Sequence, residues 1–208
     1  MLPPPTRDLD PIISPFNKER LFRVHQTKFR ATEFNPGTKG NGRFHPIYNE
    51  KKEFIPTLYA SDQINGALAE TIFRDTLIGD PVYHSELILK NLSRLSCKID
   101  LDLIDLTGFG LNRIGLTSEQ LFVFDVDQYA ITARWAEALH AACPNAHGMQ
   151  WQTVGYPKAL SILLFGDRVK ESQLEELGNS ELLYEGNGFK RILKAASLIN
   201  ATIIMDAV

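Results

Sequence analysis

The sequence predicts an α+β protein with a mixed or antiparallel sheet and flanking helices. Its predicted strands and helices alternate irregularly, and several links between consecutive strands are too short for the helical crossover that a parallel pair needs. With 44% hydrophobic and 23% charged residues, the composition is that of an ordinary globular protein, and 208 residues suffice for one domain. We expect an extended arm at residues 1–19 and a single domain at residues 20–208.

The amino-terminal arm is predicted from its prolines. Proline fixes φ and lacks a backbone donor, so a segment rich in it is extended rather than helical. We therefore expect the core to begin near Leu21. The prolines of this segment are Pro3, Pro4, Pro5, Pro11 and Pro15.

Strands are expected where short apolar or alternating runs are bounded by turn residues. Between 34 and 46, three glycines stand between two prolines, which is typical of a loop. Near the carboxyl terminus, residues 173–177 are predicted as a short charged helix. The predicted strands are residues 21–25, 57–60, 83–89, 98–106, 148–154, 159–165 and 202–205.

Three longer segments carry helical signals. Ser61 or Asp62 can cap a helix that runs to about Asp75, because its apolar residues recur at offsets of three and four. A second helix is expected at 129–142, where Pro144 prevents continuation. A third is expected at 189–198.

Charge and hydrophobicity exclude several classes of partner. There are 22 basic and 25 acidic side chains, a net charge of −3, so a broadly basic surface for nucleic acid is not expected. No apolar run approaches the length of a membrane helix, and prolines occupy the start of the chain where a signal peptide would have its apolar segment. We expect a cytoplasmic protein that binds neither nucleic acid nor membranes.

Metal and hydrolase sites are also not indicated. Cys97 and Cys143 are the only cysteines, and neither belongs to a CxxC motif or to a cluster with histidine. The histidines do not have the HExxH spacing, and no GxSxG motif occurs. We assign no metal ligand and no catalytic triad. The five histidines are His25, His45, His84, His140 and His147.

The glycine-rich loop is the first candidate site. Its glycines, at 37, 40 and 42, match neither the Walker pattern nor the dinucleotide fingerprint, and no helix follows at once. Arg43 lies inside this loop and Arg23 on the preceding strand, and guanidinium groups bind phosphate in a bidentate manner. The alternative is an ordinary mobile loop with two arginines in surface ion pairs.

Glu70 is the second candidate. It is the only ionisable residue between Asp62 and Arg74. Such a carboxylate usually lies on the solvated flank of a helix. Functionally, it could hydrogen-bond ribose hydroxyls and stabilise an oxocarbenium-like charge as a glycosidic bond breaks. No second carboxylate that could pair with it is evident.

Six sequence blocks, taken in order, resemble the RES-domain family. The combination and order of the blocks are specific, although each block alone is a weak signal. They are FRVH at 22–25, GNGRFHP at 40–46, TLYAS at 57–61, ALAETIF at 67–73, TARWAEALH at 132–140 and HGMQWQT at 147–153.

The resemblance implies a bacterial toxin with a fold similar to that of ADP-ribosyltransferases, which consumes NAD by cleaving the nicotinamide–ribose bond. NAD is then a substrate, no cofactor is required, and inorganic phosphate, water or a protein side chain is the acceptor. Arg43 and Glu70 match the family's arginine and glutamate. Tyr59 matches its tyrosine, and Arg23 matches the arginine of its first strand. Pyrophosphate is then expected on Arg23 and Arg43, a stacked ring on Tyr59 and the ribose on Glu70.

The family's serine is replaced here. Thr153 stands at its position and keeps the hydroxyl, with an added methyl group that restricts χ1. The resemblance further implies self-association and an antitoxin partner that binds DNA and covers the glycine-rich entrance. Two alternatives stay open, a protein ADP-ribosyltransferase of the same fold and a catalytically silent module that only binds the antitoxin.

Overall fold

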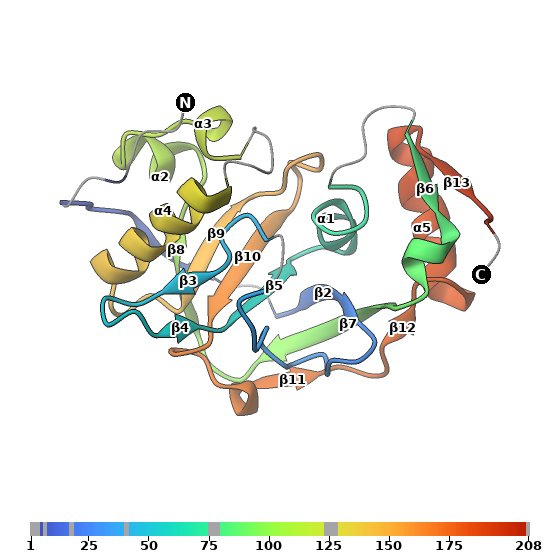
Figure 1. Cartoon of the computed structure of the whole chain (residues 1–208), viewed down its shortest axis with the longest axis horizontal. Helices are drawn as coiled ribbons and strands as arrows, with labels where there is room; N and C mark the ends of the chain where they lie inside the picture. The colour runs from blue at the N-terminus through green and yellow to red at the C-terminus, as the bar shows by residue number, and fades with distance from the viewer. Residues whose placement is uncertain are drawn as a thin grey trace.

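The computed structural model describes residue 5 and residues 8–16, 19–39, 42–74, 80–122 and 129–206. Figure 1 presents the arrangement of its helices and strands. The strands are β1 (Ile13–Phe16), β2 (Leu21–Gln26), β3 (Ile47–Tyr48), β4 (Phe54–Ile55), β5 (Thr57–Ser61), β6 (Pro81–Tyr83), β7 (Lys90–Cys97), β8 (Leu101–Asp105), β9 (Gly148–Gln152), β10 (Leu160–Phe165), β11 (Leu174–Glu176), β12 (Glu181–Leu182) and β13 (Thr202–Ile204). The helices are α1 (Ile64–Ala69), α2 (Gly108–Arg113), α3 (Ser118–Phe122), α4 (Tyr129–Ala142) and α5 (Gly186–Ile199), with short 3-10 helices η1 (His84–Leu87) and η3 (Glu171–Gln173).

One large sheet organises the described residues. Its strands follow the order β1-β8-β9-β10-β5-β2-β7-β11, and β12 pairs with β7. The β8–β9 pair is parallel, whereas the other pairs of this sheet are antiparallel. The predicted α+β class with a mixed sheet is therefore confirmed.

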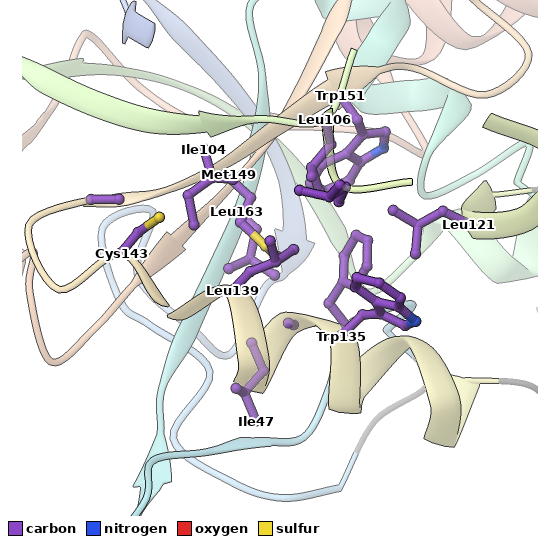
Figure 2. Close-up of a cluster of buried hydrophobic side chains, with 14 of the residues drawn as sticks. Ile47, Ile104, Leu106, Leu121, Trp135, Leu139, Cys143, Met149, Trp151 and Leu163 are labelled. Carbon is purple, nitrogen blue, oxygen red and sulfur yellow. The ribbon is translucent and has the colours of Figure 1, made fainter. Parts of the chain in front are cut away.

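Both faces of the central strands are buried. Along β10, Leu163 and Phe165 join the cluster beneath α4, and Ile162 and Leu164 join a second cluster on the other face. Figure 2 shows the first cluster, in which Trp135 and Leu139 of α4 pack over Met149, Trp151 and Leu163. A third cluster forms where α1 and α5 pack near β2 and β7. The continuous apolar run of β10 follows from this two-sided burial.

Most of the predicted elements are present. The helix at 129–142 and the strands beginning at 21, 57 and 148 have close counterparts in α4, β2, β5 and β9. The expected strand at 83–89 is wrong, because η1 occupies 84–87 and the long strand β7 follows it. The expected helix at 173–177 is also wrong, because Leu174–Glu176 pairs with β7 as β11. Sheet pairing provides backbone partners there that local charge patterning does not indicate.

Two predicted boundaries differ from the structure. β1 lies inside the predicted arm, pairs with β8 and buries Phe16, so the sheet begins before Leu21. α1 ends at Ala69, and Glu70 follows as its carboxyl-terminal cap. The predicted end at Asp75 lies outside the described residues. Capping also differs, because Ser61 and Asp62 hydrogen-bond to the backbone of Leu160 and so hold the start of β10.

Candidate functional site

A pocket of about 400 Å³ lies beside the central strands of the sheet. Its walls come from β2, β5, β7, β9, β10, α1 and the segment that follows α1, and from the loop that contains Gly42, Arg43 and His45. Its volume falls within the range of small-molecule sites. Of the residues predicted as functional, Arg43, Tyr59 and Glu70 line this pocket.

The Glu70 carboxylate is held through one of its oxygens. Oε1 accepts hydrogen bonds from the Trp151 indole N–H at 3.1 Å, the Val154 backbone N–H at 3.2 Å and the Ser161 hydroxyl at 3.1 Å. Among the described residues, every hydrogen bond to this carboxylate falls on Oε1. Oε2 is therefore left for a ligand in the pocket.

Thr153 reaches the carboxylate only through Ser161. The two hydroxyl oxygens lie 2.7 Å apart, and Thr153 does not line the pocket. An ionised carboxylate is only an acceptor, so the single Ser161 proton goes to Glu70 and Thr153 must donate to Ser161. Both hydroxyl groups are buried, so each proton needs an acceptor. This direction of donation gives an acceptor to both. The structure thus gives the residue at the family's serine position an indirect contact with Glu70.

Tyr59 projects its hydroxyl group beneath the glycine-rich loop. The hydroxyl oxygen accepts the Phe44 backbone N–H at 3.0 Å. Burial raises the pKa of Tyr59 above its ordinary value, so the phenol is protonated at neutral pH. No hydrogen bond among the described residues uses the proton of this hydroxyl, so that proton is available to a ligand. The loop lies close, because a Cβ placed on Gly42 would come 2.9 Å from this hydroxyl.

Arg43 is buried and firmly positioned. Its guanidinium donates to the Phe122 carbonyl at 2.6 Å and lies 5.5 Å from the centre of the Phe122 ring. The Tyr129 ring is 6.0 Å away. Its backbone carbonyl accepts the Thr132 hydroxyl of α4. These contacts fix a cation in the pocket wall, where desolvation strengthens its attraction for an anion.

Arg23 does not lie in the pocket lining. Its side chain is buried on the other side of β2, and it donates to the carbonyls of Ala31 and Glu33 at 2.7 and 2.6 Å. Burial lowers its pKa to about 10. Arg23 therefore holds the loop that follows β2, and the structure does not bring it together with Arg43.

The glycine-rich loop is anchored through a defined hydrogen-bond chain. Asn35 accepts the Gly37 N–H on its amide oxygen at 3.2 Å and so presents its NH₂ group to Nε2 of His45, also at 3.2 Å. Nε2 must be unprotonated to accept this bond. Burial lowers the pKa of His45 in keeping with this neutral form. Gly40 of the same loop lies outside the described residues.

The lining residues that sequence reasoning did not predict include two donors to Glu70 and two cations. Ser161 is a lone hydroxyl in the apolar run of β10, and that exception to the pattern was its only signal. Arg74 and Lys90 are distant in sequence from the glycine-rich loop, so only the fold brings their charges to it. Trp151 lay in a recognised block, but nothing in its spacing indicated a contact with Glu70. All four line the pocket, and they are Arg74, Lys90, Trp151 and Ser161.

Within the described residues, no group of three or more His, Cys, Asp and Glu side chains could hold a metal ion. In the same residues, no helix is long and apolar enough to cross a membrane.

Comparison with known proteins gives a family and a fold. The model of the RES domain family matches residues 20–182. No curated protein matches the chain. A similar solved structure is the crystal structure of the M. tuberculosis MbcT–MbcA toxin–antitoxin complex. A chain of that complex is 16% identical, with a TM-score of 0.56, and the match covers 80% of this chain and 86% of that one. This likeness shows that the two chains share a fold.

Proposed function

Because the chain belongs to the RES domain family, we propose that it is the toxin of a bacterial toxin–antitoxin pair and that it degrades NAD by cleaving the nicotinamide–ribose bond. The similar fold in the MbcT–MbcA toxin–antitoxin complex supports the first part. The arrangement of the pocket supports the second. The partner is then an antitoxin that restrains the enzyme.

The observation that carries this proposal is the position of Glu70. Three donors hold Oε1, no hydrogen bond from the described residues reaches Oε2, and Glu70 lines the pocket. A carboxylate fixed in this way stabilises positive charge that develops on a ribose ring as its glycosidic bond breaks. Because the donors are already in place, little reorganisation is needed when the charge forms.

One carboxylate is sufficient for this reaction. Among the described lining residues, Glu70 is the only acidic side chain. O-glycosides generally need a second carboxyl group to protonate the leaving oxygen. In NAD the nicotinamide nitrogen is already cationic, so it takes the electron pair of the breaking C–N bond and leaves neutral without a proton. Water or phosphate then adds to the ribose carbon.

Arg43, Tyr59 and Thr153 have supporting roles in this proposal. Arg43 offers a buried cation to a phosphate oxygen, and Tyr59 offers its hydroxyl proton and ring to the ligand. Thr153 acts through Ser161 on Glu70. Arg23 serves the loop after β2 rather than the substrate.

The proposal is tested by incubating the purified, antitoxin-free protein with NAD, with and without inorganic phosphate, and separating the products by chromatography. Release of nicotinamide is expected, and a second product that requires phosphate identifies a phosphorylase. Label from NAD on a protein would instead identify a protein ADP-ribosyltransferase. Intact NAD from folded protein in both samples would contradict an enzymatic function and favour a silent antitoxin-binding module.

Expression in bacteria gives a second test. Growth arrest with depletion of NAD is expected, and Glu70→Gln, which preserves the side-chain shape, should relieve both. An exposed substitution of the same type, Glu175→Gln on β11, is the matched control and should remain toxic. Toxicity that survives Glu70→Gln would contradict the assignment of this carboxylate.

A further inference from the structure

Lys90 brings an additional cation to the pocket from β7. It is the first residue of that strand and pairs with Gln26 of β2. Alternation along the strand places it on the same face as Leu92, which packs with Phe22 and Val24. Phe22, Val24 and Lys90 all line the pocket. The Lys90 side chain therefore belongs to the pocket side of the sheet.

The ammonium group of Lys90 has no close counter-ion within the described part of the chain. None of the hydrogen bonds and ion pairs found there involves its side chain, and the acidic residue that acts on it is the exposed Glu86. Burial lowers the pKa of Lys90, Glu86 raises it and the nearby charge of Arg74 lowers it. A half-buried ammonium beside a second cation is unfavourable unless an anion joins them.

Arg74 adds another cation to the pocket lining. Its guanidinium lies 5.9 Å from the centre of the Tyr129 ring, and that of Arg43 lies 6.0 Å from the same ring. Arg74 also acts electrostatically on Tyr59 and on Lys90. Among the described lining residues, the cations Arg43, Arg74 and Lys90 thus share the pocket with one carboxylate, that of Glu70.

We propose that Lys90, together with Arg74, forms a subsite for phosphate groups at the β7 end of the pocket. This inference rests on the proposed function, since it assigns to that subsite either the pyrophosphate of the dinucleotide or free phosphate acting as acceptor. The chemistry is the same in both cases: a phosphate oxygen accepts from the ammonium group of Lys90, which has no close carboxylate among the described residues. The family resemblance predicts that Arg23 binds the pyrophosphate. In this proposal Lys90 and Arg74 bind phosphate instead.

The test compares Lys90→Gln with Lys90→Arg and with the exposed control Lys194→Gln. Lys90→Gln should raise the KM for NAD about tenfold if the subsite holds the pyrophosphate, or the KM for inorganic phosphate if it holds the acceptor, as expected for loss of a charge-assisted hydrogen bond. The effect on kcat should be smaller. Lys90→Arg should restore most of the affinity, and Lys194→Gln should behave as the parent protein. Thermal unfolding should show that Lys90→Gln is folded.

A binding measurement and a kinetic measurement together separate the two sources of phosphate, and the binding measurement does not require turnover. Calorimetry with ADP-ribose should show weaker binding to Lys90→Gln if the subsite takes the pyrophosphate. A raised KM for inorganic phosphate, with unchanged ADP-ribose binding, would identify the acceptor instead. Unchanged affinity for both ligands in folded Lys90→Gln would overturn the inference.

The same measurements distinguish failure of the inference from failure of the proposed function. If the parent protein binds ADP-ribose in a Lys90-dependent way but does not cleave NAD, the subsite stands and the activity is wrong. If NAD is cleaved and Lys90→Gln has the parent KM values, the activity stands and the subsite is wrong. In buffer without phosphate, cleavage of nicotinamide riboside, which has no phosphate, should be insensitive to Lys90→Gln.

Discussion

The hydroxyl of Ser161 donates to Oε1 of Glu70 at 3.1 Å, which makes β10 a direct support of the candidate catalytic carboxylate. Ser161→Ala removes this donor and leaves the pocket otherwise intact. Because hydrogen bonds to charged groups contribute about 1.5–3 kcal/mol, kcat for NAD cleavage should fall roughly tenfold or more. Steady-state kinetics on protein with a checked unfolding midpoint measures the effect.

Substitutions at Thr153 provide the graded control for this chain. Thr153→Val keeps the shape but cannot donate to Ser161, so its loss of kcat should be smaller than that of Ser161→Ala. Thr153→Ser keeps the donor and should retain activity. An effect of Thr153→Val greater than that of Ser161→Ala would show that Thr153 acts on the reaction by another route.

Arg23 should matter for stability rather than for substrate binding. Arg23→Met retains bulk but leaves the carbonyls of Ala31 and Glu33 without their donor. Each unsatisfied buried acceptor costs about 1–3 kcal/mol, so the free energy of unfolding should drop by about that amount or more. Urea denaturation measures this change. The KM for NAD of the folded fraction should stay near the parent value, and a large rise in KM would place Arg23 in substrate binding after all.

The fold was predictable where local sequence patterns and tertiary burial agree. The apolar stripe of α4 follows from the core beneath this helix, and the apolar run of β10 follows from burial on both faces of the sheet. The pairing of β7 with β11 was missed, because it depends on a partner 77 positions away at Leu174 and Cys97. Local charge patterning carries no information about such a partner.

The candidate site was predictable only where family motifs contain its residues. Arg43, Tyr59 and Glu70 lie in such motifs and meet in one pocket. Arg23 lies in a motif too, but strand alternation turns its side chain to the opposite face from Phe22. Lys90 lies outside every motif and enters the pocket because β7 pairs with β2.

Gly42 should control the position of Tyr59. A methyl group at Gly42 would lie 2.9 Å from the Tyr59 hydroxyl and 3.1 Å from Cβ of His45, so the loop or the ring must shift. Gly42→Ala should therefore lower kcat/KM for NAD while the unfolding midpoint changes little. Gly108→Ala, where an added Cβ meets nothing within 4 Å, is the matched control. Full activity of Gly42→Ala would show that the close approach of this loop to Tyr59 is not required.

Acidification should weaken the fold through His45. Its pKa is lowered by burial, and its neutral Nε2 accepts the amide of Asn35, so protonation breaks this bond. A base with a depressed pKa contributes stability that is present above its ordinary value of about 6.5 and is lost as the pH falls through the folded-state value. Unfolding midpoints measured from pH 7.5 to pH 5 should fall more steeply for the parent protein than for His45→Gln. One titrating proton limits the difference between the two proteins in the pH slope of the free energy of unfolding to about 1.4 kcal/mol per pH unit. Parallel curves would mean that His45 does not titrate against folding, and that the Asn35 contact survives its protonation.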